Sequence, residues 1–140
     1  MEQSLPPIGD PRAYAENNPF MAYNHIEITR IEPDEQGDYR AEVRVALRHE
    51  SMNLHGAVHG GLLYGLADCV AGIAARCDGN DYVTQSAHIN FLRNTRQGTV
   101  YALAGVVRRG RRMVVLHVAI RDAEGRLLAD CAVDMMRTAE

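Results

Sequence analysis

One aspartate stands alone in the most apolar stretch of the sequence. Residues 62–75, LLYGLADCVAGIAA, contain Asp68 as their only charged residue. An ionised carboxylate moved out of water without a partner costs several kcal/mol, and no cation lies three or four positions away to pair with it on a helix. The pattern therefore predicts a chemical function, in which Asp68 attacks an electrophilic carbon or activates a water molecule that does so. The alternative is a structural aspartate satisfied by backbone or hydroxyl groups.

Two glycines, Gly60 and Gly61, precede this stretch where its helix should begin. The first N–H groups of a helix have no intrahelical acceptor and lie at the positive end of its dipole. Glycine leaves these donors unobstructed, so a carbonyl bound there would be stabilised as it gains negative charge. The alternative is a tight entry into the helix with no chemical role.

The acid and the glycines lie too far apart to act on one carbonyl within one chain. Asp68 follows Gly61 and Gly60 by seven and eight residues, which is about 10–12 Å along a helix axis. A reacting carbonyl must lie within about 3 Å of both groups. We therefore expect a twofold dimer in which the acid of one chain faces the glycines of the other.

The composition is that of an ordinary globular protein. The chain has 140 residues, of which 46% are hydrophobic and 24% charged. A net charge of −3 argues against a nucleic-acid binder, and no run reaches the roughly 20 apolar residues of a membrane span. The three cysteines lack metal or redox spacing, so we expect free thiols in a cytoplasmic protein that binds no metal: Cys69, Cys77 and Cys131.

The expected elements make an α+β protein. Residues 1–18 should form a lead with a short helix, which opens at Asp10-Pro11 and ends before Asn18-Pro19, and residues 19–140 a single domain. A long helix is expected over about 59–77, and because it is apolar all round it should be buried all round. Strands are expected over six ranges joined by short connections: 20–32, 39–48, 82–93, 99–108, 113–122 and 127–137. Short connections favour antiparallel pairing, which predicts a six-stranded antiparallel sheet wrapped around one long central helix.

The central motif resembles a known signature. It reads Asn53-x-x-Gly56-x-x-His59-Gly60-Gly61, followed by Leu66-Ala67-Asp68. This spacing is similar to that of the hotdog-fold acyl-CoA thioesterases, PaaI-like branch. Residues 89–93 and 108–111 are similar to that family's third strand and following hairpin, and the resemblance covers roughly residues 22–137.

The resemblance implies hydrolysis of an acyl-CoA thioester to a carboxylic acid and coenzyme A, in dimers or tetramers whose helices are antiparallel across the dimer. It implies that Asn53 helps to position the nucleophile or water, that the Thr84 hydroxyl lies near the acid, and that His59 orients the loop or contacts the thioester. Each has a structural alternative: a turn asparagine, a strand threonine and a helix cap. No metal or cofactor is implied, since coenzyme A is part of the substrate.

Four arginines are concentrated in the predicted hairpin Arg108-Arg109-Gly110-Arg111-Arg112. Such a run is often no more than a solvated turn. The resemblance gives it a function, because guanidinium groups are well shaped to bind the phosphates of coenzyme A. We therefore predict that Arg108, Arg109 and Arg111, together with Arg93, bind substrate along with Gly61.

Two other functions stay open at this stage. A hotdog dehydratase acting on hydroxyacyl thioesters would need a histidine and a carboxylate at one substrate carbon, and a non-catalytic acyl-CoA binding protein would use the same pocket without turnover. No motif encodes the acyl group.

Overall fold

The computed structural model describes residues 17–138, which form six strands, two α-helices and two single 3₁₀ turns. The strands are β1 (Glu27–Pro33), β2 (Tyr39–Ala46), β3 (Tyr82–Phe91), β4 (Thr99–Arg109), β5 (Met113–Asp122) and β6 (Leu127–Arg137). The helices are α2 (Pro19–Tyr23) and α3 (Gly60–Ala75), and the 3₁₀ turns are η1 (His49–Ser51) and η2 (Arg76–Asp78).

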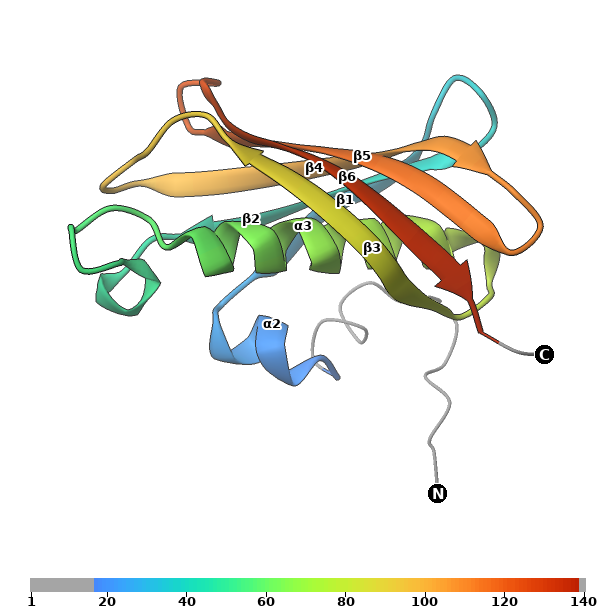
Figure 1. Ribbon diagram of the computed structural model, residues 1–140, viewed down its shortest axis with the longest axis horizontal. Helices are drawn as coiled ribbons and strands as arrows, with labels where there is room; N and C mark the ends of the chain where they lie inside the picture. The colour runs from blue at the N-terminus through green and yellow to red at the C-terminus, as the bar shows by residue number, and fades with distance from the viewer. Residues whose placement is uncertain (1–16, 139–140) are drawn as a thin grey trace.

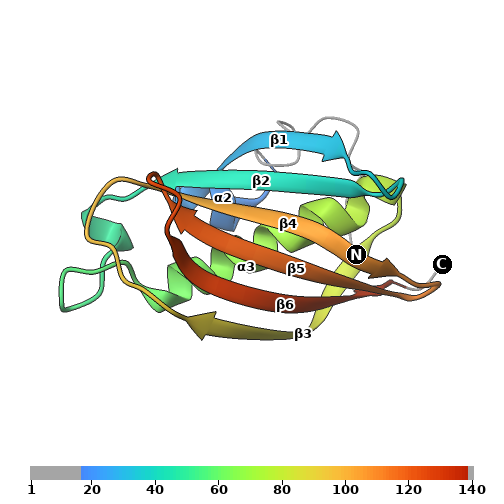
Figure 2. The same cartoon turned by 90° about the horizontal axis from the view of Figure 1, so that it is seen from above.

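All six strands belong to one antiparallel sheet with the order β1-β2-β4-β5-β6-β3. The sheet curls over α3, which lies along its concave face (Figures 1 and 2). β3 therefore forms one edge, although the chain reaches it directly after the central helix. This arrangement confirms the predicted hotdog fold.

The core lies between the sheet and α3. Period-2 alternation directs one face of each central strand inward, so that Val43, Ala102, Leu116 and Val133 are fully buried. From α3, Leu66 contributes a fully buried side chain to the same cluster. Small residues such as Ala71 and Ala74 allow the helix backbone to approach the sheet closely.

The N-terminal region differs from the prediction of a strand over 20–32. Residues 19–23 form the short helix α2, and the strand begins only at Glu27. Asn18 caps this helix by accepting a hydrogen bond from the Met21 N–H at 3.1 Å, and Pro19 occupies its first turn. The helix expected after Asp10 falls on residues outside the described part of the chain.

The structure also corrects the expectation that α3 is buried all round. Its side facing away from the sheet carries a partly exposed stripe: Gly61, Tyr64, Gly65 and Asp68. Part of this stripe is covered by α2, which lies on the opposite side of α3 from the sheet (Figure 1). The Phe20 ring packs directly on Gly65, where an added Cβ would lie 2.6 Å from the ring. The lone carboxylate is thus half-buried in this chain rather than enclosed.

Candidate active site

The aspartate of the central helix contacts a threonine of the edge strand. The Thr84 hydroxyl, from β3, donates a hydrogen bond to Asp68 Oδ1 at 2.5 Å. Among residues 17–138, this is the hydrogen bond that the Asp68 carboxylate makes, and Oδ2 is left open. The same hydroxyl oxygen lies 3.4 Å from the Met135 sulfur. The structure therefore brings the predicted pair together: one carboxylate oxygen accepts the threonine hydroxyl, and the other has no hydrogen-bond partner among the described residues.

The histidine before the helix acts as its cap. His59 has extended backbone angles, and its Nδ1 accepts a hydrogen bond from the Gly61 N–H at 2.8 Å. The N–H groups of Leu62 and Leu63 bond to the His59 carbonyl oxygen. The Gly61 amide is thus occupied, which does not fit its predicted role as a donor to substrate. Within the described part of the chain, only the Gly60 N–H of this first turn is without an acceptor.

The phenylalanine at the end of β3 lies against Gly60. A Cβ added at Gly60 would come within 3.3 Å of the Phe91 ring, and Phe91 is 55% exposed. The Gly60 donor therefore lies beside an apolar wall that opens to the surface. Asp68 and Gly60 stand at different levels of α3, as their spacing requires, so one chain does not bring them together.

The asparagine of the motif shapes the loop before the helix. Asn53 Oδ1 accepts hydrogen bonds from the His55 N–H (2.9 Å) and the Ala57 N–H (3.2 Å). Gly56 has φ +74° in this turn, a conformation that favours glycine. In this structure, the Asn53 oxygen therefore holds the loop that leads to His59 and Gly60, as the turn alternative expected.

A hollow of about 280 Å³ adjoins the Asp68–Thr84 pair on the side toward the C-terminal end of α3. Cys69 and Gly72 border it from the helix, Val83 from the edge strand, and Met135 from β6. Cys69 shares this wall without being a nucleophile, because burial, with a smaller effect of the Asp68 charge, raises the pKa of its thiol to about 12.

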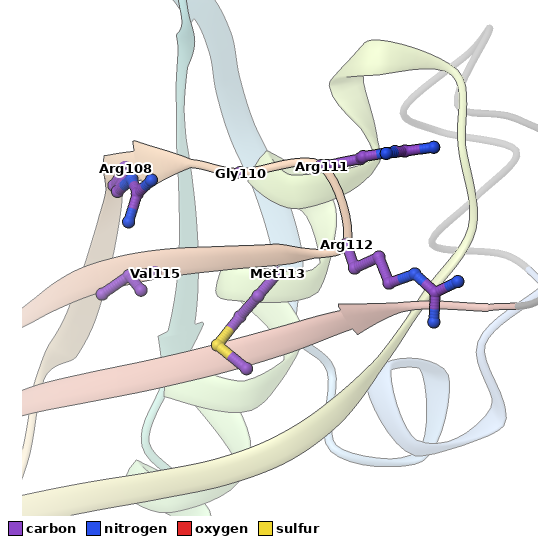
Figure 3. A pocket seen from close by; sticks show the side chains of 6 residues that line it. All are labelled: Arg108, Gly110, Arg111, Arg112, Met113 and Val115. Carbon is purple, nitrogen blue, oxygen red and sulfur yellow. The ribbon is translucent and has the colours of Figure 1, made fainter.

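The arginines of the β4–β5 hairpin surround a second hollow, of about 420 Å³, on the outer side of the sheet. Arg108, Arg111 and Arg112 border it together with Met113 and Val115. Arg111 and Arg112 extend from the turn itself, on the other side of Gly110 from Arg108 (Figure 3). Within residues 17–138, none of these three guanidinium groups is in an ion pair.

Arg109 points toward the end of α3 and not toward the outer side of the sheet. This position argues against the prediction that it binds phosphate. Its guanidinium forms a two-bond fork with Asp38, both distances 2.9 Å, and a 2.9 Å ion pair with Asp78. It also donates to the carbonyl oxygens of Ala74 and Ala75 at the end of α3. These partners occupy all of its nitrogen atoms, so we remove Arg109 from the predicted substrate-binding set.

The predicted arginine after β3 lies at the opposite end of the molecule from the hairpin. Arg93 follows Phe91 and is exposed, and its N–H bonds to the Leu128 carbonyl oxygen. Nearby, the Arg96 guanidinium donates to the His55 carbonyl oxygen at 2.7 Å. The hairpin instead lies where α3 ends (Figure 1). One chain thus carries separate arginine groups at the two ends of its central helix.

Two comparisons with known proteins agree on the family. A sequence profile of the thioesterase superfamily matches residues 55–129, which include Gly60, Asp68 and Thr84. The chain belongs to the thioesterase superfamily. An esterase-type protein of Saccharolobus solfataricus is 33% identical to it over 90 residues, which is 63% of this chain and 64% of that protein. ComA2 of Bacillus subtilis, also classed as an esterase, is 30% identical over 77% of this chain and 89% of its own.

Solved structures give the same result for the fold. The PaaI protein of the Escherichia coli phenylacetic acid degradation operon aligns with a TM-score of 0.83 at 25% identity, covering 91% of this chain and 90% of that one. A Streptococcus pneumoniae thioesterase-type protein, solved with coenzyme A, aligns with a TM-score of 0.74 at 28% identity, covering 82% and 90%. The chain is thus a hotdog-fold thioesterase-superfamily protein of the PaaI-like type.

No helix within residues 17–138 is long and apolar enough to cross a membrane. In the same residues, no three His, Cys, Asp or Glu side chains are grouped so that they could hold a metal ion.

Several contacts of the site region carry no recognisable signal in the sequence. The Phe91–Gly60 and Phe20–Gly65 contacts and the partners of Arg109 join residues far apart in the chain. Only the Asn18-Pro19 pair, a helix-start signal, could have revealed α2 from the sequence.

Proposed function

We propose that this protein hydrolyses acyl-CoA thioesters to a carboxylic acid and coenzyme A, with Asp68 as nucleophile or general base. The observation that carries the proposal is the Thr84–Asp68 hydrogen bond, which orients the carboxylate and leaves Oδ2 open. Membership of the thioesterase superfamily supports the reaction class.

The coenzyme A part of the substrate is supported by a relative. The Streptococcus pneumoniae protein was solved with coenzyme A. Two further structures of that protein carry an alanine in place of an aspartate and of a threonine that stand 16 positions apart. Asp68 and Thr84 are also 16 positions apart. We therefore propose coenzyme A thioesters as the substrates and this pair as the catalytic acid and its hydroxyl partner.

The chemistry needs a base or nucleophile and a donor for the developing oxyanion. In one route Asp68 removes a proton from water, which attacks the thioester carbon; in the other its carboxylate attacks and water then hydrolyses the anhydride. In both routes the Gly60 N–H stabilises the oxyanion, the C–S bond breaks, and the thiolate leaves and takes up a proton. We propose that no metal or resident cofactor takes part.

We propose that the site is shared between two chains. The positions of its residues along α3 and along β3 are compatible with a twofold axis. Tyr64 lies midway between Gly60 and Asp68 on α3, and Ala87 and His88 lie midway between Thr84 and Phe91 on β3. These midpoints lie on the two sides of a narrow space between α3 and β3 that leaves no room for a water molecule. A twofold axis at this level would bring Asp68–Thr84 of one chain to Gly60–Phe91 of the other.

Strand β3 is suited to such pairing. It is a sheet edge whose backbone can accept another strand, and Val83 and Phe91 are each 55% exposed on it. Antiparallel pairing of β3 with a second copy would join the two sheets and cover the exposed stripe of α3. We propose a dimer of this kind, and leave tetramer formation as a prediction of the resemblance alone.

The same twofold symmetry would bring arginines of both chains together where the phosphates of coenzyme A could bind. Antiparallel helices put the C-terminal end of one α3 beside the N-terminal end of the other. The hairpin arginines of one chain that form no ion pair within the described residues (Arg108, Arg111 and Arg112) and Arg93 of the second would then border one region. We propose that these groups bind the substrate phosphates, for which the guanidinium fork is well suited.

The hollow beside Asp68 is proposed to hold the acyl group. Its volume of about 280 Å³ is roughly twice that of a cavity that binds benzene. Cys69, Gly72 and Met135 give it a partly apolar wall, with Asn18 and Arg76 beside them, and this space would admit an acyl group of one ring or a short chain. A substitution that fills it, Gly72→Leu, should lower turnover of larger acyl groups more than that of acetyl-CoA.

The decisive experiment measures release of free thiol from a panel of acyl-CoAs. We expect Asp68→Asn to lower kcat by about 10²-fold or more while the binding of a CoA ester, measured by calorimetry, stays within a few-fold. Thr84→Val should lower kcat less. Unchanged turnover in Asp68→Asn would rule out the proposed mechanism, and hydration of an enoyl ester without thiol release would indicate the dehydratase instead.

A further inference from the structure

Arg109 makes the densest set of polar contacts described for the chain, and these contacts surround the junction between α3 and β3. The guanidinium contacts the β1–β2 turn through Asp38, the end of α3 through the Ala74 and Ala75 carbonyl oxygens, and η2 through Asp78. A fourth contact, 3.3 Å, reaches the Tyr82 hydroxyl at the start of β3.

These partners are themselves joined. The Tyr82 hydroxyl donates a 2.5 Å hydrogen bond to Asp78 Oδ2, the oxygen that also pairs with Arg109. Only 21% of the Arg109 side chain is exposed, and 18% and 23% of Asp38 and Asp78. A partly buried, bidentate guanidinium is geometrically restrictive, because its planar fork fixes both direction and distance.

The junction matters because the two residues of the proposed catalytic pair stand on either side of it. Asp68 is on α3, and Thr84 is on β3 two residues after Tyr82. Their hydrogen bond therefore depends on how β3 leaves the end of α3. The connection between them is short, η2 followed by three residues, and it contains Gly79 with φ +84°.

We propose that Arg109 is a positioning residue for the Asp68–Thr84 pair: by joining the end of α3 to the start of β3, it holds the threonine hydroxyl against the carboxylate. This inference rests on the proposed function. Arg109 itself lies at the end of the helix, about 9–10 Å along the axis from Asp68, so it acts through the two elements and touches no reacting atom.

The test compares Arg109→Lys with a matched control. Lysine keeps the charge but loses the fork. Arg126 forms a more exposed, single-bond pair with Asp122, Nε to Oδ2 at 2.7 Å, in the β5–β6 turn away from the junction. Arg126→Lys should therefore alter the melting temperature alone. All kinetics are measured well below the lowest melting temperature, so that loss of folded protein does not contribute.

We expect Arg109→Lys to lower kcat about tenfold or more with KM within twofold, since a displacement of about 1 Å in a catalytic group can reduce the rate 10²-fold. In a Thr84→Val background the same change should lower kcat less than about twofold, because the contact that it supports is already lost. A merely destabilising role would not produce this dependence on Thr84.

Wild-type kcat in folded Arg109→Lys, or an equal reduction with and without Thr84, would overturn the inference. If Arg109→Lys does not fold, Asp78→Asn decides in its place, because it keeps the side-chain shape while removing the pair; it should show the same pattern at smaller amplitude. Full activity of Asp68→Asn would instead overturn the proposed function itself, so the two failures are distinguishable.

Discussion

His59 Nδ1 accepts the Gly61 N–H at 2.8 Å, so the histidine of the motif serves the helix that carries the acid. This bond takes up one of the two glycine donors, so the Gly60 N–H is the first-turn donor that has no acceptor among residues 17–138. The two glycines thus differ in their surroundings: Gly61 lies so close to the His59 ring that an added Cβ would be 2.9 Å from Nδ1, whereas Gly60 lies beside the Phe91 ring.

A capping role for His59 predicts that a different cap can replace it. Asparagine is among the best N-cap residues, whereas alanine removes the cap at a cost of about 1 kcal/mol. We expect His59→Asn to retain most of the activity and stability and His59→Ala to lose stability by about that amount. Thermal unfolding and kcat measured on both variants check this. An equal, large loss of kcat in both would instead give the imidazole a chemical role.

The shared site predicts complementation between two inactive variants. Asp68→Ala removes the acid, and Gly60→Val introduces a side chain against Phe91 at the oxyanion donor. In a mixed dimer one of the two sites contains neither change. Each mixed dimer should therefore recover up to about half of the activity of a wild-type dimer. The measurement is thiol release after subunit exchange, with exchange verified by mass spectrometry of tagged chains. Complete exchange without recovery would contradict a site built from two chains.

The contact between Phe20 and Gly65 predicts that the effect of Gly65→Ala on stability changes sign when the Phe20 ring is removed. Alanine is favoured over glycine in a helix interior by about 1 kcal/mol, but at Gly65 its Cβ would lie 2.6 Å from the Phe20 ring. In the wild type, Gly65→Ala should therefore be neutral or destabilising, because the ring must move off the helix. In a Phe20→Ala background it should stabilise by about 1 kcal/mol. Urea unfolding of the four proteins checks the cycle, and equal effects in both backgrounds would argue against the contact.

Most of the fold could be predicted because its signals are local. The alternation of apolar and polar residues in β2 indicates a strand without knowledge of its neighbours, and the apolar run after Gly60 indicates the central helix. The N-terminal error has a local cause as well. A polar residue followed by proline predicts a helix start at Asp10-Pro11, and the same signal at Asn18-Pro19 marks the start of α2 and not the end of a preceding helix.

The site was less predictable because register decides which side chains meet. Inward residues of β4 alternate as far as Val106, but a register shift between Val106 and Arg108 turns Arg109 inward and Arg108 outward. The run of arginines contains no signal that shows which of Arg108 and Arg109 points inward. In the same way, the contact between Asp68 and Thr84 is implied by the resemblance to the family, and the residue types alone do not predict it.

The outward arginines predict a substrate-dependent defect. If Arg108, Arg111 and Arg112 bind phosphates, their combined replacement by alanine should raise KM for an acyl-CoA at least about tenfold, since several charge-assisted hydrogen bonds are lost. The same acyl group on N-acetylcysteamine, which carries no phosphate, should show an unchanged KM. Arg121→Ala, at an exposed arginine near the end of β5, serves as the control. A parallel rise in KM for both substrates would refute the assignment.

The Arg109 cluster predicts how stability depends on pH. The hydrogen bonds from Arg109 are the largest cause that lowers the pKa of Asp38. Burial opposes ionisation of Asp78, but hydrogen bonds from Tyr82 and Asn80 and the Arg109 charge leave its pKa below the usual value as well. A carboxyl with a lower pKa in the folded state binds fewer protons than it does unfolded. Its contribution is therefore complete above about pH 4 and is lost as the pH falls through the folded value.

Asp38→Asn isolates this contribution, because asparagine keeps the shape but cannot titrate. We expect the variant to be less stable than the wild type at pH 7, and the difference in the free energy of unfolding to shrink progressively below about pH 4. Urea unfolding at a series of pH values from 7 down to the acid transition measures both proteins. A difference that stays constant over this whole range would show that the Asp38 carboxylate contributes nothing through its charge, and the fork with Arg109 would then serve packing alone.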